Sequence, residues 1–201
     1  MPENTRELRI AEALAARLCH ELVSPVGAIA NGVEILAQDP DFAADATALI
    51  GQSAAQAACR LQYYRLAYGA LAEIAPETAR LAALAFFAEG RYRCIWPTAA
   101  IPGILVKPAL NLLLLAVGAL PRGGELVLER EPAGITVAAS GPGARIGPAL
   151  PSLFSADIGT DQIGAQTVQA IYTAALARRD GFAITVTEDR TDRVILRIFS
   201  Q

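Results

Sequence analysis

Apolar residues recur along the first part of the chain at alternating steps of three and four residues. Between about Thr5 and Gln38, seven positions keep this spacing: Ala15, Leu18, Leu22, Pro25, Ile29, Gly32 and Leu36. The spacing places side chains on one face of a helix and is typical of the seam of a helix bundle. It predicts one long helix, with the apolar stripe continuing through Pro25 although an internal proline disfavours a helix.

A second segment, from about Pro40 to Ala72, follows the same rule. Its predicted seam consists of Ile50, Ala54, Ala57, Leu61, Tyr64, Tyr68 and Leu71. Asp39 has the side chain of an N-cap, and Pro40 suits a first helical turn. Two helices joined so closely predict an antiparallel hairpin, and its alanine-rich stripes make a poor core for one copy. We therefore expect a homodimer whose two hairpins form a four-helix bundle.

The periodicity becomes mixed after Ala75–Pro76, which we take as the boundary between a helical domain, residues 1–75, and a second domain, residues 76–201. In the second domain we expect helices at 77–89, 103–120 and 162–178, and strands at 91–97, 125–130, 135–139, 182–187 and 194–199. Residues 140–160 are rich in Gly and Pro and predict a loop, and residues 188–192 predict a turn. The order of these elements predicts an α fold for the first domain, followed by an α+β domain in which a sheet packs against helices.

The composition of the chain restricts the classes of partner and the cellular compartment that we expect. The chain has 201 residues, enough for two small domains, and a formal net charge of -3, which argues against a generic binder of nucleic acid or of a membrane surface. The longest apolar run, from Pro108 to Pro121, is too short to span a bilayer. Cys19, Cys59 and Cys94 are far apart and lack ligand spacing, so we expect reduced, buried thiols. These features favour a cytoplasmic chain.

The only histidine of the chain, His20, falls in the first predicted helix. With the seam facing inward, the opposite face carries Arg17, His20, Ser24, Gly27, Asn31 and Glu34. A lone exposed histidine can be a solvated side chain without a role. A neutral imidazole is also a good nucleophile near neutral pH. Glu21, which follows it, is placed to orient the ring or accept its proton, and the alternative is a solvated helix residue.

The run His20-Glu21-Leu22-Val23-Ser24-Pro25 resembles the H-box of two-component histidine kinases and phosphotransferases. The longer run HELVSPVGAIANGVE, from His20 to Glu34, closely resembles the signature of the ChpT-type histidine phosphotransferases of alphaproteobacterial phosphorelays. Looser matches follow at Leu120-Pro-Arg-Gly-Gly124 and Thr167-Val-Gln169. The resemblance implies a dimeric hairpin that bears a phosphorylatable His20. It also implies an α/β sandwich similar to the ATP-binding domain of histidine kinases.

Kinases of this kind bind ATP through three sequence boxes, and each box is degraded in this chain. Of the N-box only Asn111 remains, while Leu115 takes the metal-ligand position and Gly118 the cationic one. Leucine offers no oxygen to a hard cation such as Mg²⁺. Ala139 replaces the aspartate that would hold adenine, and Gly164 is the one glycine left in the last box. We therefore expect a degenerate ATPase-like domain that does not bind ATP.

The leading hypothesis is a phosphorelay histidine phosphotransferase, with His20 and Glu21 as its catalytic residues. His20 would accept a phosphoryl group from the receiver domain of a hybrid histidine kinase and pass it to response regulators. Docking residues are expected at Arg17, Ser24, Gly27 and Asn31. We expect no cofactor on this chain, with Mg²⁺ held by the partner's receiver domain, and neither nucleic acid nor membrane as a partner. The alternatives are an ATP-dependent histidine kinase core that lacks a sensor, and a non-catalytic dimeric adaptor.

Overall fold

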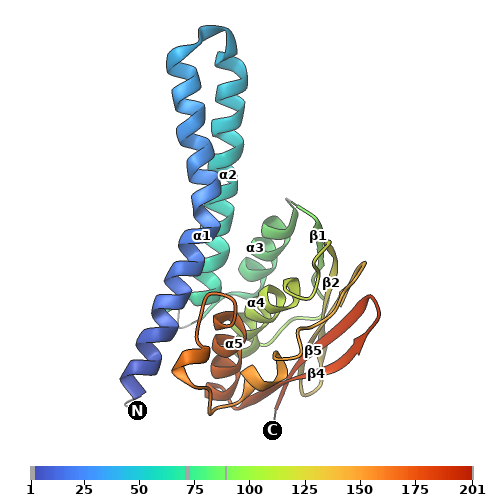
Figure 1. The fold of residues 1–201 in the computed structure, drawn as a ribbon. Coiled ribbons are helices and arrows are strands. Elements are labelled where there is room, and N and C mark those ends of the chain that lie inside the picture. The colour runs from blue at the N-terminus through green and yellow to red at the C-terminus, as the bar shows by residue number, and fades with distance from the viewer. Residues whose placement is uncertain (1–2, 71–72, 89, 201) are drawn as a thin grey trace.

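A hairpin of two long helices projects beyond a second domain of shorter helices and strands, which packs beside the lower half of the hairpin (Figure 1). The computed structural model describes residues 3–70, 73–88 and 90–200. The hairpin consists of α1 (Glu3–Gln38) and α2 (Ala43–Tyr68). The remaining elements are α3 (Pro76–Ala88), β1 (Tyr92–Ile95), α4 (Gly103–Val117), β2 (Gly124–Glu131), β3 (Gly134–Ser140), α5 (Val168–Arg179), β4 (Phe182–Arg190) and β5 (Arg193–Ser200). The expected fold class, α followed by α+β, is confirmed.

The turn of the hairpin differs in detail from the expected one. Pro40–Phe42 forms a short 3-10 helix, η1, and α2 begins only at Ala43. The carboxylate of Asp39 accepts a hydrogen bond from the Asp41 N–H at 3.1 Å, so Asp39 caps this turn. At its other end α2 stops at Tyr68, and Leu71 and Ala72, which we expected in this helix, lie outside the described residues.

The predicted seam of α1 faces α2 where the two helices come closest. Pro25 and Gly32 are buried. A Cβ atom at Gly32 would lie only 2.6 Å from Cγ1 of Ile50, so the close approach of the two helices requires a glycine there. The ends of the stripe are less covered, because Ala15 and Leu36 are exposed in the single chain.

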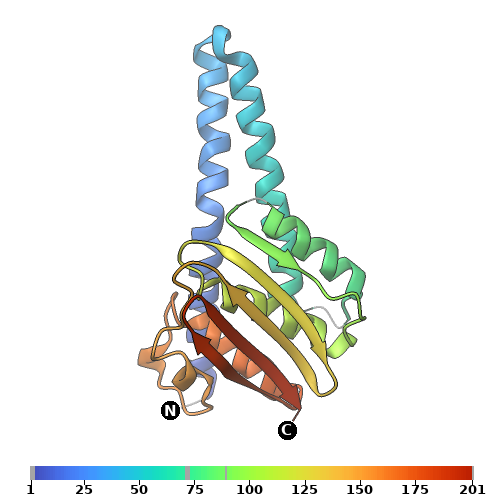
Figure 2. The ribbon, with the colours of Figure 1, turned by 90° about the vertical axis from the view of Figure 1, so that its right-hand side faces the viewer.

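The second domain is a five-stranded sheet with helices on one face. Its strand order is β1-β2-β3-β5-β4, in which β1 runs parallel to β2 and every other neighbouring pair is antiparallel. Figure 2 shows the strands in front of α4 and α5. The buried side chains of β2, β3 and β5 include Leu126, Leu128, Val137, Leu196 and Ile198. The C-terminal half of α2 joins this core, since the ring of Tyr63 stacks on that of Phe86 at 4.3 Å.

Two stretches of the second domain were predicted incorrectly. We expected α5 from Gln162, but it begins at Val168, after a 3-10 turn at Thr160–Gln162. The hydroxyl of Thr167 donates to the Gln162 carbonyl at 2.6 Å and accepts from the Gly164 N–H at 3.0 Å, and such local bonds compete with a helix. The expected turn at 188–192 is mostly strand. The chain reverses at 191–192, where Asp192 has a φ of 64°.

A second apolar stripe runs along α1 and faces solvent in the single chain. It consists of Cys19, Val23, Val26, Ala30, Val33 and Ala37, all exposed and again three or four residues apart. The segment Thr5–Gln38 is long and apolar enough to cross a membrane, and only 11% of its most apolar window is buried. However, the polar side chains of His20, Ser24 and Asn31 gather on a separate face. This division is typical of a helix that packs against protein on one side.

Candidate functional site

His20 lies near the middle of α1 with its side chain exposed. Ser24, Gly27 and Asn31 follow on the same face of the helix and are exposed as well. A Cβ atom added at Gly27 would meet nothing within 4 Å, so this surface is open. The structure thus brings together the histidine and three of the four expected docking residues on one accessible face of the helix.

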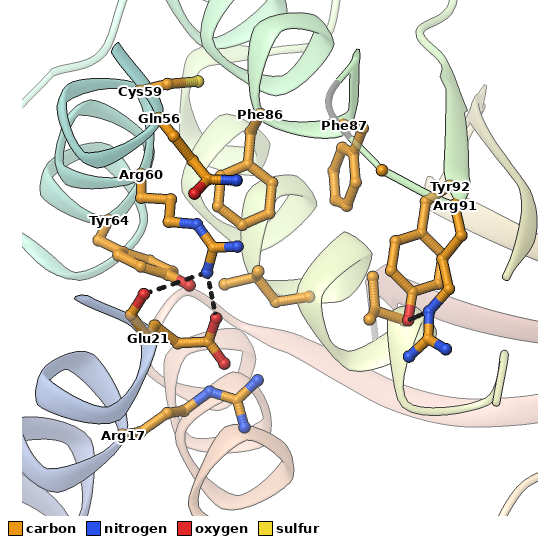
Figure 3. A pocket seen from close by; sticks show the side chains of 13 residues that line it. Arg17, Glu21, Gln56, Cys59, Arg60, Tyr64, Phe86, Phe87, Arg91 and Tyr92 are labelled. Atoms are coloured by element: carbon orange, nitrogen blue, oxygen red, sulfur yellow. Dashed lines mark hydrogen bonds and ion pairs between the residues drawn. The ribbon is translucent and has the colours of Figure 1, made fainter. Parts of the chain in front are cut away.

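Glu21 forms an ion pair with Arg60 that links α1 to α2 (Figure 3). Nη1 of Arg60 donates to the Glu21 carboxylate at 2.6 Å and to the Glu21 main-chain carbonyl at 3.2 Å. Both side chains are about one-third exposed, at 32% and 29%. Glu21 directly follows the histidine in the chain, and its carboxylate is held by Arg60, so it is not an unpaired, solvated glutamate.

Arg60 is a site residue that the sequence interpretation missed. The predicted α2 seam was partly wrong, because Ala54 and Leu61 are exposed and Arg60 faces α1 in place of Leu61. A charged residue in an apolar stripe needs a partner of opposite charge. Which carboxylate on α1 faces it depends on how the two helices are staggered, and the spacing of apolar residues does not determine that stagger.

Arg17 lies away from the open face on which we expected it. Its side chain is half-buried and points toward Glu21 in the close view (Figure 3). Its Nε atom is enclosed and has no hydrogen-bond partner among the described residues. The expectation of a solvent-facing Arg17 was wrong because the second domain packs against this end of the hairpin, which a helical pattern alone does not reveal.

Asn111, the residue left over from the N-box, is fully buried and ties α4 to the end of α2. Its Nδ2 donates to the carbonyl oxygens of Ala67 at 2.8 Å and Lys107 at 3.0 Å. Its Oδ1 accepts from Nε2 of Gln169 at 3.1 Å, and the Tyr68 hydroxyl donates to Oε1 of Gln169. Burial raises the pKa of Tyr68 to about 12, so this hydroxyl keeps its proton at neutral pH. We call Tyr68, Asn111 and Gln169 the polar latch.

The other degraded box positions also serve packing. Leu115 is buried within α4, at 8% exposure, and Ala139 is fully buried in β3. Ala139 pairs with Leu126 of β2 and Val194 of β5, so its methyl group belongs to the sheet core. In this structure the residues at both positions are part of the hydrophobic core.

Replacing Gln169 with leucine should destabilise the fold, because Tyr68 and Asn111 would lose their buried partner. An unpaired buried polar group costs about 1–3 kcal/mol, and we expect a loss of at least that size in the free energy of unfolding. Denaturant unfolding measures it. The control is Gln166→Leu, an exposed position on the same segment, which should stay within about 0.5 kcal/mol of the wild type. Equal stability of the two variants would contradict the polar latch.

The described residues hold no group of three or more His, Cys, Asp or Glu side chains that could bind a metal ion. Cys19, Cys59 and Cys94 are all described, and no disulfide joins them. Cys19 is exposed and the other two are half-buried, so the expectation of buried thiols was wrong. Burial nevertheless raises the pKa of the Cys94 thiol to about 12.

Comparison with known proteins identifies the family. Residues 76–192 match the family described as histidine phosphotransferase C-terminal domain. The chain is 34% identical over 204 residues to the protein phosphotransferase ChpT of Brucella abortus (strain 2308), covering 96% of this chain and 97% of that protein. A solved structure described as a bacterial phosphotransferase superimposes with a TM-score of 0.81 at 33% identity, covering 95% of this chain and 96% of the other. The chain belongs to the ChpT-type family of phosphorelay histidine phosphotransferases.

Proposed function

We propose that His20 carries the phosphoryl group in this phosphotransferase. It would receive the group from a receiver-domain aspartate of a hybrid histidine kinase and give it to the aspartates of response regulators. The observation that carries this proposal is the position of the chain's only histidine. It is exposed on an open helix face, beside a carboxylate that Arg60 holds in place.

The chemistry needs few groups on this chain. One nitrogen of the neutral imidazole attacks the phosphorus atom of the aspartyl phosphate, the bond from phosphorus to the aspartate oxygen breaks, and a phosphorus–nitrogen bond forms. The other ring nitrogen then carries a proton that must leave, and Glu21 is the neighbouring base that can accept it. Mg²⁺ would remain in the acidic pocket of the receiver domain, so no step requires a metal ligand from this chain.

Glu21→Gln should slow phosphotransfer while leaving the fold intact, because glutamine has almost the same shape but cannot accept the proton. The loss of a general base predicts a decrease of about 10²–10⁴-fold in the transfer rate. Single-turnover labelling from a phosphorylated receiver measures that rate. Glu34→Gln, an exposed glutamate later on α1, is the matched control and should transfer at the wild-type rate. If both variants transfer equally fast, Glu21 is a structural residue only.

Ser24, Gly27 and Asn31 are the docking residues we propose for the receiver domain. Their small or polar side chains leave the surface around His20 open to a rigid partner. Arg17 stands at the edge of this surface, where the hairpin meets the second domain. The family implies partners among kinase and response-regulator domains, and we propose the cytoplasm as the place where they meet.

Homodimerisation through the hairpin would cover the two apolar stripes that the single chain leaves exposed. On α1 this is the stripe from Cys19 to Ala37, and on α2 it is a stripe of small or apolar residues, Gly51, Ala54, Ala58 and Leu61, all of them exposed. Small residues on α2 allow a second pair of helices to approach closely. We propose a four-helix bundle of two copies, with residues 1–75 as the dimerisation and phosphotransfer domain and residues 76–201 as a degenerate ATPase-like domain.

A chase experiment tests the carrier role. The chain is labelled by a radiolabelled phospho-receiver, separated from this donor, and then mixed with the receiver domain of a response regulator. We expect the label to leave the chain and appear on the acceptor aspartate. Label that stays on the chain, or that is released only as inorganic phosphate with every acceptor tried, would contradict a relay function.

A further inference from the structure

A cavity of about 370 Å³ lies at the junction of the hairpin and the second domain, which we call the junction cavity. Its walls come from α1, α2, α3, β1 and α4 with their adjoining loops, and Figure 3 looks into it. The volume is within the range of small-molecule sites in proteins, which are usually concave and lined by apolar groups with a few charged ones. The degraded nucleotide-box residues Leu115, Gly118 and Ala139 do not line it. Leu114 and Val117, two other residues of the N-box stretch on α4, do line it, so the cavity lies beside this stretch but not at the positions that would hold Mg²⁺ or adenine.

The walls of the junction cavity carry more positive than negative charge. Three arginines, Arg17, Arg60 and Arg91, line it with one carboxylate, Glu21. Glu21 is already paired with Arg60. Among the described residues, neither Arg17 nor Arg91 forms an ion pair. The Arg17 side chain hydrogen-bonds the neutral Tyr68 hydroxyl, while its enclosed Nε has no partner there, and Arg91 donates only to neutral oxygens. Arg17 is partly withdrawn from water, whereas Arg91 is exposed. A guanidinium in the position of Arg17, without a carboxylate, favours an anionic ligand.

Aromatic rings form the wall between these arginines. Phe86 and Phe87 of α3 stand in the middle of the view, with Tyr92 beyond them (Figure 3). Aromatic rings favour stacked or edge-to-face contact with another ring, and their apolar faces gain from being covered. The junction cavity thus places an apolar, aromatic surface within one small volume with two guanidinium groups that lack a carboxylate partner.

We propose that the junction cavity binds a small aromatic anion, with its acidic group against Arg17 and its ring against Phe86 and Phe87. The shared chemistry is one aromatic ring that bears a phosphate or a carboxylate. This ligand site goes beyond the phosphotransfer function and does not depend on it. Binding would join α1, α2 and α3 through one molecule at the junction of the two domains.

Calorimetric titration of the whole chain with phenyl phosphate tests this site, in the absence of any receiver. We expect saturable binding with a dissociation constant on the order of 0.1 mM, a plausible strength for so small a ligand. A second titration with benzoate, which carries a carboxylate in place of the phosphate, shows which of the two acidic groups binds more tightly. Inorganic phosphate lacks the ring and benzyl alcohol lacks the charge, so each should bind at least about tenfold more weakly. Equally tight binding of benzyl alcohol, or no binding of either aromatic anion, would overturn the proposal.

Single substitutions test whether phenyl phosphate binds in the junction cavity. Arg17→Gln should weaken phenyl phosphate at least about tenfold, the usual loss when a charged hydrogen bond is removed. Arg122→Gln, an exposed arginine that does not line the cavity, should bind like the wild type. Unchanged binding by Arg17→Gln would place the ligand elsewhere and refute the assignment. If Arg17→Gln fails to fold, the comparison of ligands on the wild-type chain still decides. Phosphotransfer is measured in a separate experiment, so an absence of ligand binding would not contradict the proposed carrier role of His20.

Discussion

His20→Ala should carry no phosphoryl label after incubation with a phosphorylated receiver, whereas the wild type becomes labelled. The reason is chemical, because alanine has no nucleophile and the chain has no other histidine that could replace it. Gel autoradiography of the separated chains measures the effect, and we expect the signal of the variant to fall to background. The label on the wild type should be lost in acid and kept in base, as is typical of phosphohistidine.

Two controls make the loss of label specific. Gln38→Ala, an exposed position at the end of the same helix, should be labelled like the wild type. The free energy of unfolding of His20→Ala should change little, because an exposed side chain on a helix contributes little to stability. Label that persists on a folded His20→Ala would show that another residue is the carrier, and the assignment of the site would then be wrong.

Ala54→Glu should convert the proposed dimer into monomers. Ala54 is exposed in the single chain but lies in the α2 stripe that a second copy would cover, so the variant would bury unpaired carboxylates in the bundle. An uncompensated buried charge costs about 3–5 kcal/mol, which predicts a dimer dissociation constant raised by roughly 10²–10³-fold or more. Sedimentation at micromolar concentration measures the change.

The matched control for this substitution is Gln52→Glu, which adds the same charge at an exposed position of α2 outside that stripe and should leave the dimer intact. A wild-type chain that sediments as a stable monomer at micromolar concentration would contradict dimerisation altogether. It would also leave the two exposed apolar stripes of the hairpin without an explanation, and the exposed Val23, at 68%, would then face water.

Most helices and strands could be predicted because patterns among residues close together in the sequence determine them. Spacings of three and four residues indicated the hairpin, and alternation on either side of the turn at 132–133 indicated the β2–β3 pair. The errors arose where a short-range bond or a distant contact decides the conformation. Thr167 bonds to Gln162 and Gly164, which delays the start of α5, and no periodicity shows this.

Sequence spacing predicted the exposed face of the candidate site but not the contacts on its buried side. His20, Ser24, Gly27 and Asn31 share a helical face by spacing alone, and the structure places them together. The pairing of Glu21 with Arg60 spans 39 positions, and that of Asn111 with Gln169 spans 58, so both depend on how whole elements pack. The sequence showed that Asn111 had survived the loss of the N-box, but only the structure shows it in the polar latch.

The most direct test of the central claim compares two phosphoryl donors for the same chain. Wild-type protein is incubated in parallel with radiolabelled Mg·ATP and with a radiolabelled phospho-receiver, with His20→Ala in each arm. If His20 receives its phosphoryl group from another protein, the wild type becomes labelled by the receiver and not by Mg·ATP. His20→Ala is then labelled by neither donor. Labelling of the wild type by Mg·ATP that saturates with nucleotide and disappears in His20→Ala would contradict this account and show an ATP-dependent kinase.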